Sequence, residues 1–410
     1  MVFLYTFRNI LYKIIFLITG NNNNLIALYS SMLFLFTGRV AYISSSGMET
    51  SLFIFILLTV IYIDFLNKES FFYIKWALCG LLVNTRPEGF VLAFLLFLKD
   101  TYYLLFNKKS SRFFYKLSLC LLIFFVLSAP YIIFSFYTNG SPFPNTFKGV
   151  NKLYTDNQYL DFIKKSTVFF LRDNIFIFLS ALAGIFFFAI NSFKEKKFNI
   201  VLIPISYFVI HLGFSIFIFP NSRHYGRYFI PDYTLLIIIG VYFAYYILSK
   251  KSFRLKTQKY ILAIILVFSI PYFVKIAFDN GNFVSNISSM HIEAVKWINS
   301  NISRNSVIGL NDIGAIGYYT ENYVIDLEGL VTPEILRYKD LDQYLKNDSI
   351  LSFILKKNAD YLIIFDNWYP GLTNMHNNYF HFIHTIYVEN NLTLGDNNLN
   401  FYKIFRDNEK

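Results

Sequence analysis

Cysteine and charge are both scarce in this chain. Only 2 of its 410 residues are cysteines, and only 15% are Asp, Glu, Lys or Arg. The two cysteines, Cys79 and Cys120, lie in apolar stretches, so the sequence contains no disulfide framework. The 6 histidines are scattered singly, and no spacing of His, Cys or carboxylates is typical of a metal site. The sequence therefore identifies no cofactor, and the spacing gives no support for a divalent metal.

Apolar residues, in contrast, dominate the composition. The chain is 55% hydrophobic and 20% aromatic, with a mean hydropathy of +0.43. These values indicate a polytopic α-helical membrane protein and exclude an ordinary soluble domain. The net charge of +11 could suggest a nucleic-acid partner. However, the lysines and arginines gather in short loops between apolar stretches, which is how charge sets membrane topology. We therefore expect membrane lipid, and no nucleic acid, as a partner.

The apolar stretches mostly approach the length of about 20 residues that a helix needs to cross a membrane. The first stretch carries Arg8 and Lys13, and no small-residue cleavage site follows it, so we expect no removable signal peptide. In total we expect about nine or ten spans, at residues 3–19, 25–43, 51–66, 71–85, 89–106, 114–136, 174–191, 199–219, 228–248 and 260–278.

The orientation of the chain follows from three basic loops, at residues 108–116, 194–197 and 250–259. Consecutive loops are separated by two spans, so all three share a side, and their excess of Lys and Arg makes that side the cytoplasm. The last span then carries the remaining residues across. We therefore expect residues 1–279 to form a multispanning membrane domain and residues 280–410 to form an exported domain.

The exported part changes character and favours a small α/β domain. A helical apolar stripe comes first, followed by short buried strands at residues 306–310, 323–327 and 361–365. Asp348 could cap a helix before the third strand. Strands that alternate with helices predict a mostly parallel sheet. The stripe consists of Ile287, Met290, Ala294, Trp297 and Ile298, and we expect the asparagine-rich patch at 372–400 to form loops.

Four polar motifs interrupt the membrane domain, and topology counting places all of them on the outer face. Charged residues at the mouth of a membrane are costly, so such motifs point to a binding or catalytic site. The motifs are Gly47-Met48-Glu49-Thr50, Arg86-Pro87-Glu88-Gly89, Pro144-Asn145-Thr146-Phe147 and Arg223-His224-Tyr225-Gly226-Arg227-Tyr228.

Each of the first three motifs has a functional and a structural interpretation. Arg86 could bind a phosphate and Glu88 could orient a sugar hydroxyl, or the two could form an ion pair at a helix end. Glu49 could be catalytic, or it could only stabilise a helix dipole. Asn145 and Lys148 lie in a long outer loop, about 137–173, that could close over a substrate or form an inert surface turn.

The fourth motif is the most specific. Arg223 and Arg227 are four residues apart, so on one helical turn they would share a face and offer two guanidinium groups to phosphate oxygens. The alternative is an interfacial anchor, because Arg and residues such as Tyr228 favour the headgroup level. His224 could act as an acid or base, but a structural histidine is the simpler interpretation.

In this order, the motifs at Gly47, Arg86, Pro144 and Gly226 resemble the arabinofuranosyl- and mannosyltransferase-like branch of the GT-C superfamily. The runs Asp312–Tyr319 and Val324–Val331 also look like the exported domain of bacterial members. The resemblance implies a glycosyltransferase in the bacterial inner (cytoplasmic) membrane. Such an enzyme would move a sugar from a polyprenyl-phosphate donor to a glycan or protein acceptor of the cell envelope, with inversion.

The resemblance also implies roles for individual residues. The phosphate contacts would be Arg86, Arg223 and Arg227, with Glu88, His224 and Tyr228 beside them, and Asn145 and Lys148 in a loop over the donor.

One departure from the family concerns the base. Members carry acidic residues in a first outer loop, and no such pair precedes Gly47, so the catalytic residue is unknown. Glu49 and Glu88 are weak candidates for it. We expect either an N-terminally truncated chain, whose full-length form would be the active enzyme, or an inactive relative. The alternatives are a non-catalytic lipid-sugar-binding or assembly protein and a transporter; the second would need polar helices at mid-membrane and internal repeats.

Overall fold

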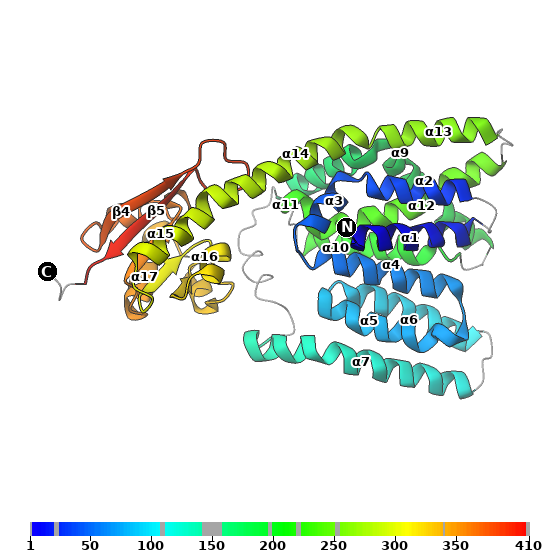
Figure 1. Cartoon of the computed structure of the whole chain (residues 1–410). Coiled ribbons are helices and arrows are strands. Elements are labelled where there is room, and N and C mark those ends of the chain that lie inside the picture. Colours follow the sequence, from blue (N-terminus) through cyan, green and yellow to red (C-terminus); the bar gives the residue numbers. More distant parts are fainter. Residues whose placement is uncertain are drawn as a thin grey trace. The chain divides into compact units, whose positions relative to one another are not determined.

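The computed structural model describes residues 2–19, 24–106, 111–141, 158–195, 199–218, 223–250, 255–338 and 341–406. Among them, the chain divides between Ala277 and Phe278 into two compact units. Unit 1 is helical, and unit 2 contains all the strands (Figure 1).

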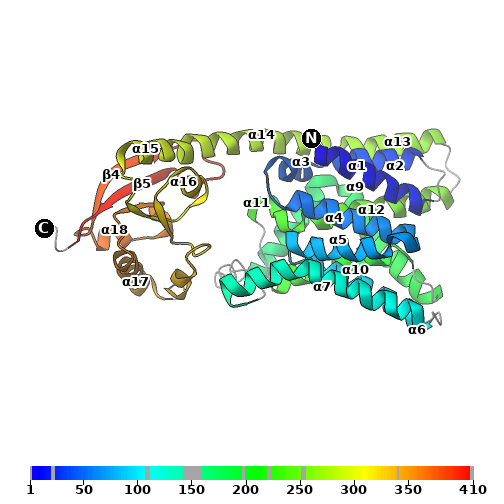
Figure 2. The same cartoon turned by 60° about the horizontal axis from the view of Figure 1, so that its bottom comes forward.

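Unit 1 is a bundle of helices whose apolar side chains leave few places for charge. The helices α4, α5 and α7 follow one another across the bundle, with α5 packed between the other two (Figures 1 and 2). The elements are α1 (Val2–Ile18), α2 (Asn24–Leu35), α3 (Gly38–Ser45), α4 (Thr50–Leu66), η1 (Glu69–Phe71), α5 (Phe72–Thr85), α6 (Gly89–Phe106), α7 (Ser111–Asn139), α9 (Gln158–Glu195), α10 (Leu202–Phe217), α11 (Arg223–Gly226), η2 (Arg227–Phe229), α12 (Ile230–Lys250), α13 (Leu255–Val267) and α14 (Ile270–Ile287), which runs into unit 2.

The helices coincide with the apolar stretches that the sequence predicts as spans. By length and apolarity, 4 helices of the described residues can cross a membrane, or up to 5 if the pair α2 and α3, bent by 59°, forms one span. The helices α4 and α10 are apolar but shorter. The prediction of helices at these positions is confirmed, whereas nine or ten spans remain a prediction.

The helix α9 begins earlier than the sequence predicts and is kinked at Asn174. Residues 158–173 were expected to lie in a loop, but they are helical, because Phe162, Ser166 and Phe170 form a buried stripe at helical spacing. At the kink, Asn174 is extended, with φ of −171°. Its side chain donates to the Ile265 carbonyl at 2.7 Å and accepts from the Ile177 amide at 3.1 Å. The bond from Ile177 satisfies a backbone amide next to the kink, and the bond to Ile265 joins the kink to α13.

Unit 2 is built on a mixed five-stranded sheet in the order β2-β1-β3-β5-β4. The strands β1 and β3 run parallel to their neighbours β2 and β1, but β5 is antiparallel to both β3 and β4. Apolar side chains cover both faces, with Leu362 and Ile364 in one core and Ile363 and Phe365 in the other. The strands are β1 (Val307–Leu310), β2 (Tyr323–Asp326), β3 (Tyr361–Ile364), β4 (Phe380–Tyr387) and β5 (Asn398–Ile404), and the main helices are α15 (Glu293–Asn301), α16 (Gly314–Tyr319) and α17 (Gln343–Lys356).

The predictions for unit 2 are partly right. The three predicted strands form, and Met290, Ala294 and Ile298 of the apolar stripe are buried. The mostly parallel sheet is wrong, because β4 and β5 add an antiparallel hairpin. The loop prediction at 372–400 is wrong for residues 380–387, which form β4, and right for residues 388–397 between the two strands. The predicted N-cap is also wrong: Asp342, not Asp348, caps α17 by accepting hydrogen bonds from two backbone amides.

Candidate functional site

The turn between α5 and α6 holds the first charged pair of the site. The chain is extended at Arg86, which ends α5, and it returns at once into α6 at Gly89. A side chain at Gly89 would lie 2.9 Å from the backbone of Leu82, so only glycine allows this close return. Within the turn, Arg86 Nη2 lies 2.5 Å from Glu88 Oε1. Arg86 is 4% exposed, so the ion pair is buried.

Arg86 also joins the turn to two other motifs. Its Nη1 donates to Thr50 Oγ1 at 3.3 Å, at the start of α4. Its guanidinium lies 4.9 Å from the ring centroid of Tyr228 and 5.5 Å from that of Phe53. The structure therefore brings together the motifs at Met48–Thr50, Arg86–Glu88 and Arg227–Tyr228, which are far apart in the sequence.

Arg227 lies on the same tyrosine ring as Arg86 but has fewer partners. Its guanidinium is 4.9 Å from the centroid of Tyr228, the same distance as that of Arg86. Its Nη2 donates to the Tyr228 hydroxyl at 2.9 Å, and its Nη1 contacts Met48 Sδ at 3.4 Å. Arg227 Nε is buried and has no hydrogen-bond partner among the described residues. A thioether is a weak acceptor, so this guanidinium keeps donors for an anion.

A break in the backbone orients Arg227. Tyr225 and Gly226 both have positive φ, of 54° and 64°, so the helix α11 ends before Arg227. The prediction that Arg223 and Arg227 share a helical face is therefore wrong, because the left-handed residues between them interrupt the helix. A side chain on Gly226 would come within 2.0 Å of the Phe229 ring.

A buried ion pair holds this break in place. Arg39 of α3 donates to the carbonyl of Tyr225 at 3.1 Å, and it forms a salt bridge with Asp173 of α9. Both charged side chains are 0% exposed.

A second polar pair, His211 and Asp232, lies close to Glu88. The Nδ1 of His211 in α10 is 2.8 Å from Oδ2 of Asp232 in α12, and both side chains are buried. Glu88 interacts electrostatically with His211, with Asp232 and with the hydroxyl of Tyr207. The predicted site residues do not include this pair. The available signal was a histidine and an aspartate inside apolar stretches, where ionisable residues are rare and often functional.

Several buried polar atoms around Glu88 lack a hydrogen-bond partner among the described residues. Each such atom costs free energy unless a ligand, water or proton satisfies it. These unsatisfied atoms come from the α5–α6 turn, α7, α10 and α12, so they surround one region of the bundle. The atoms are Glu88 Oε2, Tyr131 Oη, Tyr207 Oη and Asp232 Oδ1.

The charge state of Glu88 is set by its neighbours. Burial alone would raise the pKa of this carboxyl, but the Arg86 guanidinium, and then His211, hold its pKa below the ordinary value. Glu88 is therefore a carboxylate at neutral pH, with one oxygen bound by Arg86 and the other available. This arrangement can accept a hydrogen bond from a hydroxyl while the neighbouring arginines attract an anion.

The remaining predicted site residues are placed as follows. Glu49 is exposed and precedes α4 without a side-chain capping bond. Arg223 and His224 lie in α11, but their side chains are outside the described part of the chain. Asn145 and Lys148 also lie outside the described residues. Among the described residues, no three His, Cys, Asp or Glu side chains form a group that could hold a metal ion.

Comparisons with known proteins match the two units differently. A family model described as a domain of unknown function (DUF8728) matches residues 284–402, within unit 2. No curated protein matches the sequence.

Among solved structures, the chain is similar to the crystal structure of ArnT from Cupriavidus metallidurans in the apo state. The TM-score is 0.56 at 11% identity, covering 98% of this chain and 82% of ArnT. It is also similar to ArnT from the same organism bound to undecaprenyl phosphate, with a TM-score of 0.54, 12% identity, and coverage of 98% and 83%. The chain therefore shares the polytopic helical fold of ArnT, and 4 helices of its described residues are long and apolar enough to cross a membrane.

Proposed function

We propose that the protein is a membrane glycosyltransferase that moves a sugar from a polyprenyl-phosphate donor to an acceptor of the cell envelope. The observation that carries this proposal is the pair of guanidinium groups of Arg86 and Arg227 on the ring of Tyr228, beside the buried carboxylate of Glu88. The fold adds support, because ArnT, which shares it, has been solved with undecaprenyl phosphate.

Arg227 is the proposed contact to the donor phosphate. It has no carboxylate partner among the described residues, and its Nε is unsatisfied. A phosphate diester would accept two parallel hydrogen bonds from such a guanidinium. Arg86, by contrast, uses both terminal nitrogens on Glu88 and Thr50. Arg86 is therefore proposed to position Glu88 and Tyr228, and to add positive charge as the phosphate leaves.

Glu88 is the proposed contact to the acceptor hydroxyl. In the transfer, the hydroxyl oxygen attacks the anomeric carbon, and the bond from that carbon to the phosphate oxygen breaks. The electron pair stays on the phosphate, which takes up the proton that the hydroxyl loses. A carboxylate with a lowered pKa is a weak base, so Glu88 is suited to accepting a hydrogen bond rather than to removing a proton. Glu88 Oε2 is thus proposed to orient the hydroxyl, and the His211–Asp232 pair to keep this region polar.

A transfer assay tests the proposal. Proteoliposomes that contain the purified chain would receive a radiolabelled polyprenyl-phosphate sugar and an envelope extract as acceptor. We expect Arg227→Ala to abolish sugar transfer without changing membrane insertion, and Arg227→Lys to keep the charge but lose most of the rate. The control is Arg304→Ala, because Arg304 is a 79% exposed arginine of unit 2. Equal transfer by Arg227→Ala and Arg304→Ala would remove Arg227 from the site.

A lipid-sugar-binding or assembly protein without catalysis is the second candidate. The observation that favours it is the Arg86–Glu88 pair, in which the charges already satisfy each other in part. The same proteoliposomes separate the two functions. Saturable binding of the labelled donor that depends on Arg227, with no transfer to any acceptor, would establish the binding function and reject the enzyme.

We also propose that unit 1 lies in the bacterial inner membrane with unit 2 outside the cytoplasm. The support is the excess of Lys and Arg in three loops on one side of the predicted spans. Both native cysteines are buried, so an introduced cysteine can be labelled selectively. In intact spheroplasts, an impermeant maleimide should label Arg304→Cys at once and Lys68→Cys only after lysis; the reverse pattern would invert the topology.

A further inference from the structure

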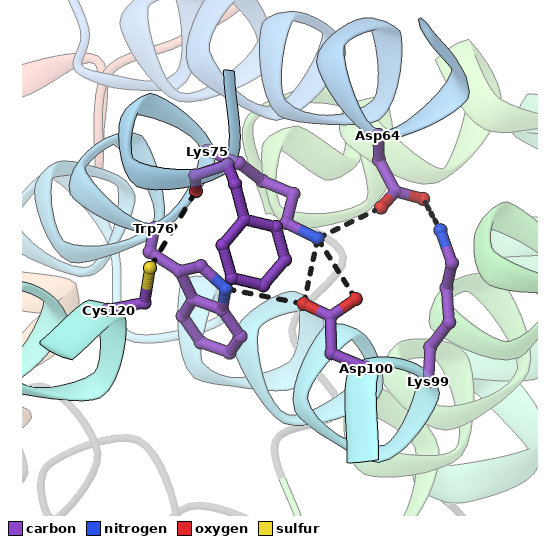
Figure 3. A network of polar contacts seen from close by, with 7 residues as sticks. Asp64, Lys75, Trp76, Lys99, Asp100 and Cys120 are labelled. Carbon is purple, nitrogen blue, oxygen red and sulfur yellow. Dashed lines mark hydrogen bonds and ion pairs between the residues drawn. The ribbon is translucent and has the colours of Figure 1, made fainter. Parts of the chain in front are cut away.

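A buried charge network lies at the other end of α5 from Arg86. Figure 3 shows Lys75 Nζ between two carboxylates, 3.2 Å from Asp64 Oδ1 and 2.8 Å from Asp100 Oδ2. Lys99 Nζ lies 2.5 Å from the second oxygen of Asp64, and Trp76 Nε1 donates to Asp100 Oδ2 at 3.3 Å. The result is an alternating row of cations and anions from α4, α5 and α6.

The network pairs two lysines with two aspartates, so its charges balance and its carboxylate oxygens are all bonded. Both oxygens of Asp64 and both oxygens of Asp100 accept hydrogen bonds from lysines. Lys75 uses its ammonium on these two residues, whereas Lys99 forms one bond and keeps further N–H groups. Any further hydrogen bond to the network is therefore donated by Lys99.

A cavity of about 280 Å³ opens beside the network. Lys68 and Lys116 stand on its wall together with the network residues. Lys68 has no ion-pair partner among the residues that the structure describes. Lys116 forms an ion pair of 3.4 Å with Glu69, whose side chain is largely exposed. The rest of the wall is mainly aromatic, with one further carboxylate, and consists of Phe71, Phe72, Tyr103, Phe113, Ile63, Asn67 and Glu69.

We propose that this cavity binds the phosphate group of a small anionic ligand, held by Lys99, Lys68 and Lys116. The cavity lining holds four lysines and three carboxylates, and this net positive charge suits an anion such as a phosphate ester. The site is distinct from the one at Arg86. Lys75 lies near the start of α5 and Arg86 directly after its end, which puts their backbones about 16 Å apart at 1.5 Å per residue.

A lipid headgroup in the adjoining leaflet is the favoured source of the phosphate. Lys99 also lines a second cavity, a largely apolar groove of about 740 Å³ between α6, α9 and α10. Leu95, Leu98 and Ile203 contribute to this groove. A phosphate at Lys99 would thus have an apolar surface beside it for a hydrocarbon chain.

The test uses the full chain in the Arg227→Ala background, so that any phosphate bound at the Arg86 end is not counted. Native mass spectrometry would measure binding of phosphatidylglycerol, and equilibrium dialysis in maltoside micelles would measure binding of radiolabelled inorganic phosphate. The test variant is Lys68→Ala with Lys116→Ala, which leaves the buried network intact. The matched control is Lys164→Ala, an exposed lysine of α9.

We expect saturable binding that the double variant weakens at least about tenfold, since each charged hydrogen bond contributes about that factor or more. The control should bind as the background does. Binding of phosphatidylglycerol alone would identify a lipid headgroup as the ligand, and binding of inorganic phosphate with the same lysine dependence would identify a free phosphate compound. No saturable binding of either probe, or equal binding by the double variant and the control, would overturn the proposal.

Discussion

The pair Arg39 and Asp173 offers the sharpest test of how the bundle supports the site. Arg39 Nε donates to Asp173 Oδ2 at 2.8 Å, Nη2 contacts the same oxygen, and Nη1 donates to the Tyr225 carbonyl. The guanidinium is surrounded by aromatic rings, with the nearest centroid, that of Phe169, at 5.2 Å. Arg39 thus joins α3 to α9 and also fixes the break that precedes Arg227.

Removing only one partner should be far more costly than removing both. Arg39→Met leaves Asp173 buried without a cation, which costs about 3–5 kcal/mol of the free energy of unfolding. Asp173→Leu should cost a similar amount. In Arg39→Met with Asp173→Leu, apolar side chains replace the whole pair, and such replacements are near neutral or stabilising. The double variant should therefore be at least about 3 kcal/mol more stable than either single variant.

Reversible unfolding in mixed micelles of SDS and a mild detergent would measure these free energies. The control cycle is Arg304→Met with Glu321→Leu, a pair of unit 2 whose side chains are 79% and 68% exposed. Its coupling should stay below about 1 kcal/mol, as for other surface pairs. If the two costs in the Arg39–Asp173 cycle simply add, the pair is not a desolvated ion pair and the reasoning fails.

Three further substitutions test local features. Gly226→Ala should destabilise the chain by roughly 1–3 kcal/mol and abolish transfer, because the new Cβ would overlap the Phe229 ring at a left-handed φ. Unfolding in SDS and the transfer assay measure the two effects. Wild-type stability and transfer would contradict the turn assigned to Gly226. Asn174→Leu should lower the free energy of unfolding by about 1–3 kcal/mol in the same assay, because it removes the hydrogen bonds from Asn174 to Ile265 and Ser269. An unchanged free energy of unfolding would mean that the kink does not depend on this side-chain amide. Asp342→Ala should lower the free energy of unfolding by about 1 kcal/mol and speed hydrogen exchange at the amides of Tyr344 and Leu345, which Asp342 caps. Faster exchange at these two amides in Asp348→Ala, and not in Asp342→Ala, would restore the N-cap predicted from the sequence.

The sequence predicts well the helices of unit 1 and the meeting of three of its polar motifs. Both predictions rest on length and topology, since apolar runs must cross the membrane and alternate loops share a face. The contacts between helices within the bundle, in contrast, do not follow from the sequence pattern. Asp64 and Asp100 belong to different predicted spans, and nothing in the linear pattern says that one lysine, Lys75, lies between them. A window that averages hydropathy hides single charges of this kind.

Local backbone geometry explains the other errors. The strand β4 has a register shift between Phe382 and His384, so its side chains lose the strict alternation by which a strand is recognised. Asparagine-rich neighbours then favour a loop prediction. At the fourth motif, the four-residue spacing of Arg223 and Arg227 predicts a shared face only if the helix is continuous. Tyr225 takes a left-handed conformation that no sequence rule demands of a tyrosine.

Three arginines of unit 1 differ in how completely the protein satisfies them, and this difference separates structural from ligand-binding roles. Arg39 has every guanidinium nitrogen bonded to Asp173 or Tyr225. Arg86 has both terminal nitrogens bonded, to Glu88 and Thr50. Arg227 alone among the three lacks a carboxylate partner within the described residues, and its Nε is unsatisfied. Because an incompletely paired, half-buried cation gains most from an incoming anion, replacing Arg39 should chiefly lower stability, whereas replacing Arg227 should chiefly lower donor binding.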